Sequence, residues 1–341
     1  MSDRRFERPL RAAVIGLGRI ASLLEDDPRR EKPCTHAGAL ASMRECTIAG
    51  GMDNDAERRR LFSERWEAPV FPEAREMIRA TRPHMVVVAT HPDSHEEYVR
   101  LAVEEGVAVA VCEKPLAHTV ASARRILGIE DSGRIRIVVN HERRFSRDYQ
   151  LVREAVMGDR FGSLLGVGAT LFFGRTTRHD RMLLHDGTHL VDAIHFLTGD
   201  FLTITGRSGP LRANRSSLFL RGTLQRRAVP VQIEVGSGRD YLHLEIELTF
   251  VSGRIRIGNG IFDWEKSGES PWYSGYRSLL SMNRTVPHPT DYFTGMMREA
   301  IRLLDEEEAV SLSSARDAFA VMRVIAEARF PNPVLRFFRR G

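Results

Sequence analysis

Cysteine is scarce in this chain, and long apolar runs are missing. The three cysteines, Cys34, Cys46 and Cys112, form no Cys-x-x-Cys pair, which argues against a structural zinc site and favours a reducing compartment. A membrane-spanning helix needs about 20 consecutive apolar residues, and the sequence has no such run. The opening stretch MSDRRFERPL lacks the apolar segment of a signal peptide. We therefore expect a cytoplasmic protein that has neither a membrane partner nor a metal site.

Lysine is equally scarce, although the chain is basic. Lysine and arginine total 50 against 45 acidic residues, but only three of the 50 are lysines: Lys32, Lys114 and Lys266. The arginines are scattered among the acids and form no basic face with interleaved aromatic residues, so we expect no nucleic-acid partner. With 341 residues, 42% of them hydrophobic, the chain is long enough for two domains with buried cores.

Strand and helix patterns alternate through the first 140 residues. Helical segments separate short apolar runs at residues 11–15, 46–52, 84–89, 107–112 and 134–139. This alternation is typical of a doubly wound parallel sheet. We predict an α/β dinucleotide-binding domain over residues 1–140.

A glycine-rich motif follows the first of these strands. It consists of Gly16, Gly18 and Ala21 in the pattern G-x-G-x-x-A. The first glycine permits a tight turn, the second lets a pyrophosphate approach the backbone, and the small third residue lets a following helix pack closely. The N-terminus of that helix would then face the phosphates. Arg19 and Ile20 lie inside the motif and are candidate cofactor contacts.

The acidic partner of such a motif normally follows about 20 positions later, at the end of the second strand. Here the first candidate is Asp53, and the extra length lies in the polar segment 24–35, which we interpret as an inserted loop. Asp53 can accept hydrogen bonds from the adenosine ribose hydroxyls. It can also cap the helix that begins near Ala56, and the two roles are compatible.

The strand at residues 107–112 ends abruptly at Glu113-Lys114-Pro115. Ligands of open parallel sheets bind at the carboxyl ends of the strands. A partly buried lysine can lose its proton, whereas arginine cannot, so Lys114 is a candidate for chemistry. The same tripeptide at residues 31–33 follows no strand, and we assign it no function.

The pattern changes after about residue 145. A strand is predicted at 162–174 and a helix at 184–197, followed by strands with strict alternation, such as Leu244, Ile246 and Leu248 between polar residues. Alternation indicates an antiparallel sheet with one covered face. Two helices, 291–304 and 313–328, close the chain. We predict a second α/β domain over residues 141–341 with an open, mostly antiparallel sheet.

Together these motifs resemble the Gfo/Idh/MocA (glucose–fructose oxidoreductase/inositol dehydrogenase) family of NAD(P)-dependent sugar and cyclitol dehydrogenases. The resemblance rests on the glycine motif, on Ala89-Thr90 followed by His95, on Glu113-Lys114-Pro115, and on residues 187–192 (GTHLVD) at a helix start. It implies an N-terminal Rossmann domain and a second domain for substrate binding and oligomerisation. It also implies a homodimer or homotetramer formed through the open sheet, with the last helix packing back on the first domain.

The resemblance also assigns roles. It places Lys114 beside the nicotinamide and the substrate, and it makes His189 the acid/base group. The residues expected to contact the cofactor are Gly16, Gly18, Arg19, Ile20, Asp53, Thr90, His91, His95, Glu113 and Lys114.

Two positions depart from the family pattern. His91 stands where the family often has proline, and His185 stands where it usually has an aspartate, four residues before the catalytic histidine. Asp186 is adjacent, and residues three and four positions apart share one side of a helix, so Asp186 can still pair with His189. Whether His185 or Asp186 takes the aspartate's role is left open.

The predicted function is oxidation of a secondary hydroxyl of a sugar, sugar derivative or cyclitol, with NAD as cofactor and NADP as the alternative. A second hypothesis is a non-catalytic NAD-binding sensor of the same fold. A remote third is a metal-dependent hydrolase that uses His185 and His189. The sequence does not identify the sugar, for which the candidate contacts are Arg143, Arg144, His179, Arg181 and Tyr292.

Overall fold

The computed structural model describes residues 6–173 and 178–329, which form two compact units. Unit 1 contains the chain up to Ser146 together with Asp291–Phe319. Unit 2 contains Arg147–Thr290 together with the chain from Ala320 onwards. No helix within the described ranges is both long and apolar enough to cross a membrane.

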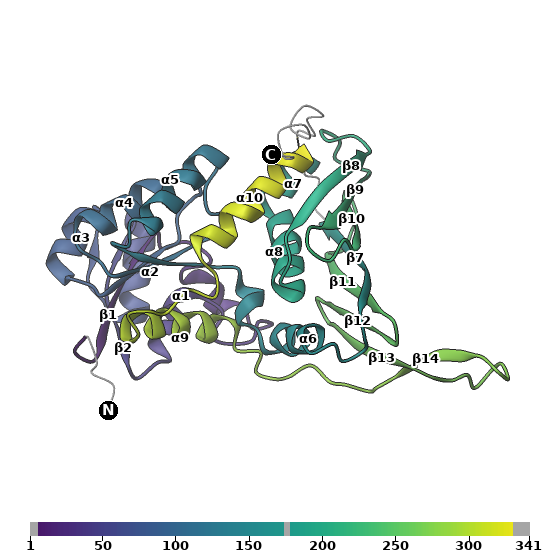
Figure 1. Cartoon of the computed structure of the whole chain (residues 1–341). Helices are drawn as coiled ribbons and strands as arrows, with labels where there is room; N and C mark the ends of the chain where they lie inside the picture. Colours follow the sequence, from purple (N-terminus) through teal and green to yellow (C-terminus); the bar gives the residue numbers. More distant parts are fainter. Residues whose placement is uncertain (1–5, 174–177, 330–341) are drawn as a thin grey trace. The chain divides into compact units, whose positions relative to one another are not determined.

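Unit 1 is built on a parallel sheet of six strands in the order β3-β2-β1-β4-β5-β6, with helices on both faces (Figure 1). The strands are β1 (Leu10–Ile15), β2 (Cys46–Met52), β3 (Val70–Phe71), β4 (Met85–Val88), β5 (Val109–Cys112) and β6 (Arg136–Val139). The helices between them are α1 (His36–Ala41), α2 (Ala56–Trp66), α3 (Ala74–Thr81), α4 (His95–Glu104) and α5 (Val120–Asp131). This is the strand order of dinucleotide-binding domains. The predicted doubly wound parallel sheet is confirmed.

The central strands form where the sequence has unbroken apolar runs. Every residue of β4 and β5 is buried, as expected for parallel strands that are covered on both faces. Their carboxyl ends therefore mark the points where polar residues first emerge from the sheet. The short β3 was not predicted, because two residues give no periodic pattern.

The helix expected directly after the glycine motif is replaced by a single turn. Ser22 N donates to the Gly18 carbonyl at 3.1 Å and Leu24 N to the Arg19 carbonyl at 2.9 Å. A short 3-10 helix, η1 (Leu23–Asp26), follows, and α1 begins only at His36. The inserted segment contains Pro28, which lacks an N–H and stops helix propagation. The insertion therefore separates the glycine motif from its helix.

The units differ from the single division predicted at residue 140, because residues 291–319 belong to unit 1. The helix α9 (Tyr292–Asp305) buries Phe293, Met297 and Leu304 in the same apolar core as strands β1, β4 and β5. This packing, rather than distance along the chain, assigns the segment to unit 1. The last helix, α10 (Ala315–Arg329), spans the division between the units, and Ser314 and Asp317 cap its start reciprocally.

Unit 2 is built on a sheet of eight strands in the order β14-β13-β12-β11-β7-β10-β9-β8. The strands are β7 (Leu164–Phe173), β8 (Leu202–Ser208), β9 (Ser217–Leu224), β10 (Pro230–Ser237), β11 (His243–Phe250), β12 (Gly253–Gly258), β13 (Ile261–Glu269) and β14 (Arg277–Ser281). All neighbouring strands pair antiparallel except β7 and β10. Leu244, Ile246 and Leu248 of β11 are buried, and the residues between them are half-buried. The prediction of an open, mostly antiparallel sheet is confirmed.

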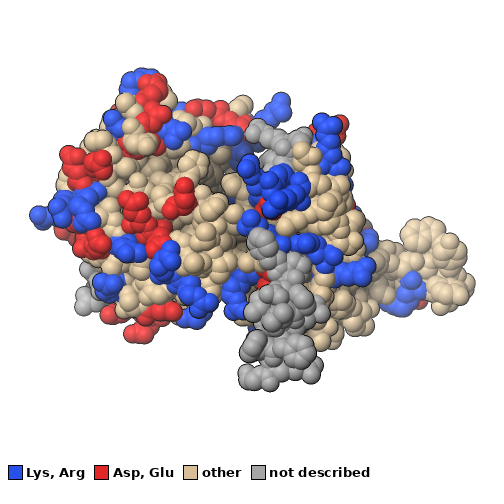
Figure 2. Space-filling view, turned by 90° about the horizontal axis from the view of Figure 1, so that it is seen from above, with Lys and Arg blue, Asp and Glu red and all other residues tan. Residues whose placement is uncertain are grey.

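One side of this sheet packs against helices of unit 2. They are α6 (Arg147–Met157), α7 (His179–His185) and α8 (Gly187–Thr198). Val152, Leu190 and Ile194 join the strand side chains in one core. The other side carries ion pairs such as Arg254–Glu265 and Arg256–Asp263. On the face of the molecule seen in Figure 2, positive and negative side chains are interspersed.

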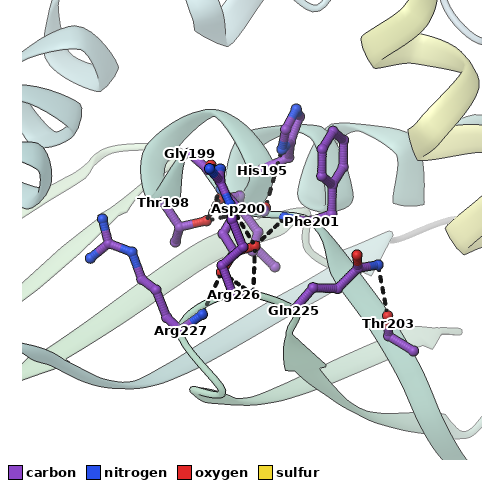
Figure 3. Close-up of polar contacts among 10 residues, drawn as sticks. His195, Thr198, Gly199, Asp200, Phe201, Thr203, Gln225, Arg226 and Arg227 are labelled. Carbon is purple, nitrogen blue, oxygen red and sulfur yellow. Dashed lines mark hydrogen bonds and ion pairs between the residues drawn. The ribbon is translucent and has the colours of Figure 1, made fainter. Parts of the chain in front are cut away.

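A buried carboxylate fixes the connection between α8 and β8 (Figure 3). Asp200 accepts hydrogen bonds from the backbone N–H groups of Phe201 (2.8 Å), Arg226 (3.0 Å) and Arg227 (2.9 Å). Burial pushes the pKa of Asp200 upwards, but these N–H groups more than offset the effect and hold the pKa below its usual value. Asp200 thereby joins the end of α8 to the β9–β10 turn.

Replacing Asp200 by alanine should lower the free energy of unfolding by about 2–4 kcal/mol at pH 7, because three backbone donors lose a charged acceptor. The folded-state pKa lies below the unfolded value of roughly 3.9. The stabilisation is therefore complete above about pH 4 and is lost as the pH falls through the folded-state pKa. Urea unfolding of both proteins at several pH values checks this: the difference should shrink in acid. A difference that is constant with pH would contradict it. The exposed Asp263→Ala is the control, with an expected change within about 0.5 kcal/mol.

Candidate functional site

The loop after β1 crosses the loop after β4 at van der Waals distance. Gly16 has φ +87°, and a Cβ atom there would lie 2.8 Å from Thr90 Cγ2 and 2.9 Å from the Ala89 carbonyl oxygen. Gly16 is therefore required both for the backbone conformation and for the close approach. At Gly18 the nearest atom to a Cβ would be Arg58 Nη1, 3.9 Å away. The backbone at Gly18 is thus open to a phosphate group, which fits a dinucleotide cofactor.

The other residues of the motif differ in exposure. Arg19 is exposed, Ile20 is half-buried, and Ala21 is buried. Arg19 and Ile20 are accessible to a ligand, and their cofactor contacts remain predictions. Ala21 lies in the core of unit 1, as the motif requires.

Asp53 lies directly after β2 and is only 6% exposed. Its Oδ2 accepts from Leu17 N at 2.8 Å, and its Oδ1 accepts from Asp55 N at 2.9 Å. Asp55, rather than Asp53, caps α2. Each carboxylate oxygen still has a second lone pair for a ribose hydroxyl. The position also ties the glycine loop to the end of β2.

Three arginines follow Asp53, and they have different partners. Arg60 pairs with Glu57 at 2.7 Å and with Glu64 at 2.6 Å, while Arg59 donates to the Asp53 carbonyl. Arg58 lies beside the glycine loop, with Nη1 3.5 Å from Asp53 Oδ2. Of the three, Arg58 is the candidate for contact with a cofactor phosphate.

His95, the first residue of α4, is fully buried. Its Nε2 lies 3.1 Å from the Thr90 carbonyl and its Nδ1 lies 3.2 Å from the Leu116 carbonyl. Burial lowers the pKa of His95, although the two carbonyls act against this shift. His95 joins the loops after β4 and β5 through these two carbonyls. Thr90 is half-buried and His91 is exposed.

Glu113-Lys114-Pro115 follows β5, as predicted, with Glu113 buried and Lys114 half-buried. The Glu113 carboxylate contacts two residues that the sequence did not identify. His36 Nε2 lies 2.7 Å from Oε1, and Asn140 Nδ2 donates to the same oxygen at 2.5 Å. Burial pushes the pKa of Glu113 upwards, but these contacts and the nearby Lys114 charge hold the pKa below its usual value.

In unit 2, the helix predicted over 184–197 is broken at Asp186. Asp186 ends α7 and precedes α8, with φ −109° and ψ −30°. Gly187, a poor helix former, follows it directly. His185 is exposed, and its Nδ1 lies 3.3 Å from Asp186 Oδ1. His189 is half-buried in the first turn of α8, and its backbone N–H donates to the Asp186 carbonyl at 3.0 Å.

Among the described residues, no three His, Cys, Asp or Glu side chains are grouped as metal ligands. His185, Asp186 and His189 belong to the end of α7 and the start of α8, in unit 2. Gly16, Thr90, His95 and Lys114 belong to unit 1.

The candidate substrate contacts divide into buried and accessible residues. His179 is fully buried, with its ring nitrogens 2.7 Å from the Pro210 carbonyl and 3.0 Å from the Ser216 carbonyl. Arg144 is buried and donates to the Leu312 carbonyl at 2.7 Å. Both are therefore structural in this conformation. Arg143 and Tyr292 are half-buried, and Arg181 is exposed.

Comparisons with known proteins agree with this geometry. Residues 10–141 match the model of the oxidoreductase family with an NAD-binding Rossmann fold, GFO_IDH_MocA. Inositol 2-dehydrogenase of Renibacterium salmoninarum is 28% identical over 283 residues, covering 79% of this chain and 78% of that protein. D-apiose dehydrogenase of Paraburkholderia graminis is 28% identical over 48% of this chain, and the match spans 46% of that protein.

A solved structure shares the fold over nearly its whole length. It is the WlbA dehydrogenase from Bordetella pertussis in complex with NADH and UDP-GlcNAcA, with a TM-score of 0.73 and 18% identity, covering 94% of this chain and 96% of that one. The sheet order and the glycine loop define a dinucleotide-binding fold. Within that class, residues 10–141 match the Rossmann-domain model of the Gfo/Idh/MocA family, which the sequence motifs resemble.

Proposed function

We propose that the protein oxidises a secondary hydroxyl of a sugar, sugar derivative or cyclitol with NAD as cofactor. The observation that carries this proposal is the position of Lys114, the second residue after β5, at the carboxyl edge of the dinucleotide-binding sheet. Ligands of such sheets bind at this edge. Relatives that act on inositol and on apiose support the substrate class.

Each proposed role follows from the chemistry of alcohol oxidation. The nicotinamide, when bound, accepts the hydride. Lys114 binds the substrate oxygen and stabilises the negative charge that develops on it. His189 removes the hydroxyl proton, a task that suits imidazole near neutral pH. Asp186 or His185, which are neighbours at the α7–α8 junction, orients His189 or relays its proton.

A substrate screen tests the proposal. Sugars, inositols and sugar acids are offered with NAD or NADP, and NAD(P)H formation is followed. Turnover of at least one polyol at about 1–10³ s⁻¹, the usual range of kcat, is the expected result. Cofactor binding without turnover of any compound would favour the NAD-binding sensor. Metal-dependent hydrolysis by the purified protein would favour the hydrolase that uses His185 and His189.

We expect a preference for NAD over NADP of at least about tenfold in kcat/KM, because a carboxylate at Asp53 repels a 2′-phosphate. Replacing Asp53 by asparagine keeps the size of the side chain and removes its charge. The variant should lose most of the preference, mainly through a higher KM for NAD. Steady-state kinetics with both cofactors measure this.

Two arginine variants of α2, Arg58→Ala and Arg60→Ala, are compared with the Asp53 variant. Arg58→Ala should weaken the binding of NADP more than that of NAD, since Arg58 Nη1 lies 3.5 Å from Asp53 Oδ2, beside the expected position of the 2′-phosphate. Arg60→Ala should change neither, since Arg60 pairs with Glu57 and Glu64 on the same helix. A wild-type preference for NADP would overturn the role of Asp53.

We also propose a homodimer or homotetramer formed through unit 2. The hairpin β13–β14 projects from the rest of its sheet (Figure 1), and its end carries few charged side chains (Figure 2). Trp272, Tyr273 and Tyr276 are each exposed by about two thirds or more. Hydrogen bonds from Trp272 N and Tyr273 N to Ser270 Oγ order this loop. Ordered aromatic side chains are typical anchors of protein interfaces.

Light scattering at micromolar concentration checks the assembly. The double variant Trp272→Ser, Tyr276→Ser should have a lower mass than the wild type, because each ring removes a large apolar area from the interface. Val251→Ser, at an exposed apolar residue outside the hairpin, should leave the mass unchanged. A monomeric wild type would contradict the proposal.

A cytoplasmic location remains part of the proposal. Its support is that Cys34, Cys46 and Cys112 are all free thiols, as is usual in a reducing compartment. Fractionation of the source cells tests it.

A further inference from the structure

The carboxylate of Glu113 is held from three directions immediately before Lys114. Its Oε1 contacts His36 Nε2 at 2.7 Å and Asn140 Nδ2 at 2.5 Å, and its Oε2 accepts from the Lys114 backbone N–H at 3.2 Å. The donors come from α1, from the end of β6 and from the peptide that follows Glu113. The Glu113 side chain therefore fixes the backbone at Lys114 relative to α1 and to the end of β6.

Within the described residues, the side chains of His36 and Asn140 form hydrogen bonds only with Glu113. Both side chains are almost completely buried, and neither His36 Nδ1 nor Asn140 Oδ1 makes a hydrogen bond within the described part of the chain. Because a carboxylate only accepts, His36 Nε2 must carry a proton and donate it. His36 Nδ1 and Asn140 Oδ1 are thus buried without a hydrogen-bond partner among the described residues, while the other polar atom of each side chain binds one carboxylate. This arrangement is unusual in a protein core.

The inserted segment 24–35 holds His36 in place. Glu25 accepts from Thr35 Oγ1 at 2.7 Å and from Cys34 N at 3.2 Å, and Thr35 Oγ1 caps α1 by accepting from Gly38 N at 3.0 Å. The Phe293 ring packs edge-on against the imidazole at 5.2 Å between centroids. The insertion thus ends in a hydrogen-bonded turn, and this turn places His36 in contact with Glu113.

Stability alone does not explain this network. Replacing a buried ionic group by apolar side chains of similar volume is often neutral or stabilising, so a buried carboxylate is weak evidence for a role in folding. Polar groups that are unfavourable for the core are expected at functional sites. The network lies next to the half-buried Lys114 at the carboxyl edge of the sheet.

We propose that His36 and Asn140 are positioning residues of the dehydrogenase centre, which hold Glu113 and thereby fix Lys114. The inference rests on the catalytic role proposed for Lys114. It also gives the inserted segment a function, because Glu25 and Thr35 set the position of His36.

The test compares His36→Ala with His36→Gln, because a glutamine amide can donate to the carboxylate as the imidazole does. His36→Ala should lower kcat about 10–100-fold, as expected when a reacting group is misplaced, with KM and the Kd for NADH within about threefold of wild type. His36→Gln should recover kcat to within about fivefold. His84→Ala is the matched control, since His84 accepts from Arg11 N at the opposite end of β4.

A second measurement follows Lys114 directly in the protein without cofactor. The chain contains only three lysines, so mass spectrometry can follow the acylation of each by an amine-reactive ester. In His36→Ala, Lys114 should be acylated at least about threefold faster than in the wild type, relative to the exposed Lys266, because it is no longer held half-buried. His36→Gln should restore the wild-type rate.

The outcomes separate this inference from the proposed function. Unchanged kcat and labelling in His36→Ala, with an inactive Lys114→Ala, would overturn the positioning role and leave the proposed function intact. Normal turnover by Lys114→Ala would overturn the proposed function itself. If His36→Ala does not fold, as judged by circular dichroism, Asn140→Ala replaces it with the same expected loss of kcat, and normal kcat and labelling in that variant would overturn the inference.

Discussion

Lys114→Ala should lower kcat by about 10²–10³-fold, which is the usual cost of removing one donor that stabilises a developing oxyanion. The reason is its position two residues after β5, where the substrate oxygen is expected and where the Glu113 side chain accepts a hydrogen bond from the Lys114 backbone N–H. Because the ammonium acts most strongly in the transition state, KM should change much less than kcat. Steady-state kinetics with the best substrate from the screen measure both constants.

Two further lysine variants make this result specific. Lys114→Arg keeps the charge but replaces a compact ammonium with a planar guanidinium that cannot lose its proton. If charge alone matters, Lys114→Arg should retain most of the activity. If a compact or titratable group is needed, it should be as inactive as the alanine variant. Lys266→Ala removes an exposed lysine of β13 and should be fully active. A loss of less than about threefold in Lys114→Ala would show that the site lies elsewhere.

Local sequence patterns predicted the features that depend on neighbouring residues. The apolar runs at residues 84–89 and 107–112 became the buried strands β4 and β5, and strict alternation in β11 predicted a one-sided sheet. The glycine motif predicted a turn that only glycine can form, and φ at Gly16 is +87°. Each of these features is set by periodicity or by backbone sterics within a few residues.

Features that depend on distant partners were not predictable in this way. His36 and Glu113 are 77 positions apart, and no local pattern marks either as a partner of the other. The sequence identified 24–35 as an inserted loop, but not that it would interrupt the helix after the glycine motif and end at His36. It also gave no sign that α9 would share a core with β5, because an amphipathic helix shows which face is buried but not against which sheet.

Residue type alone did not indicate which of the candidate site residues are buried in the fold. His95 and His179 were expected to contact ligands, yet both are fully buried and face backbone carbonyls. A histidine that bonds to the main chain and one that contacts a ligand are identical in sequence. The difference lies in burial, which tertiary packing decides.

His189→Ala should lower kcat by about 10²–10⁴-fold, the usual contribution of a positioned acid/base group, while NAD still binds. His189 lies half-buried in the first turn of α8 and is followed by a core-facing Leu190, so its place is fixed by the helix. Asp186→Asn should lose less than His189→Ala, because it would alter the orientation of the imidazole without removing it.

His185 is the alternative to His189 as the catalytic base. Its side chain is exposed and lies 3.3 Å from Asp186 Oδ1, so it can move without disturbing the core. If His185→Ala lost turnover while His189→Ala kept it, the two roles would have to be exchanged. His195→Ala is the matched control on the same helix, since His195 stacks on Phe201 and bonds to the Asp200 carbonyl. That variant should lose stability but not kcat. In this assignment only residues of unit 1 bind the nicotinamide. The Kd of His189→Ala for NADH should therefore lie within about threefold of the wild-type Kd. A larger increase in Kd would indicate that His189 contacts the cofactor rather than the substrate.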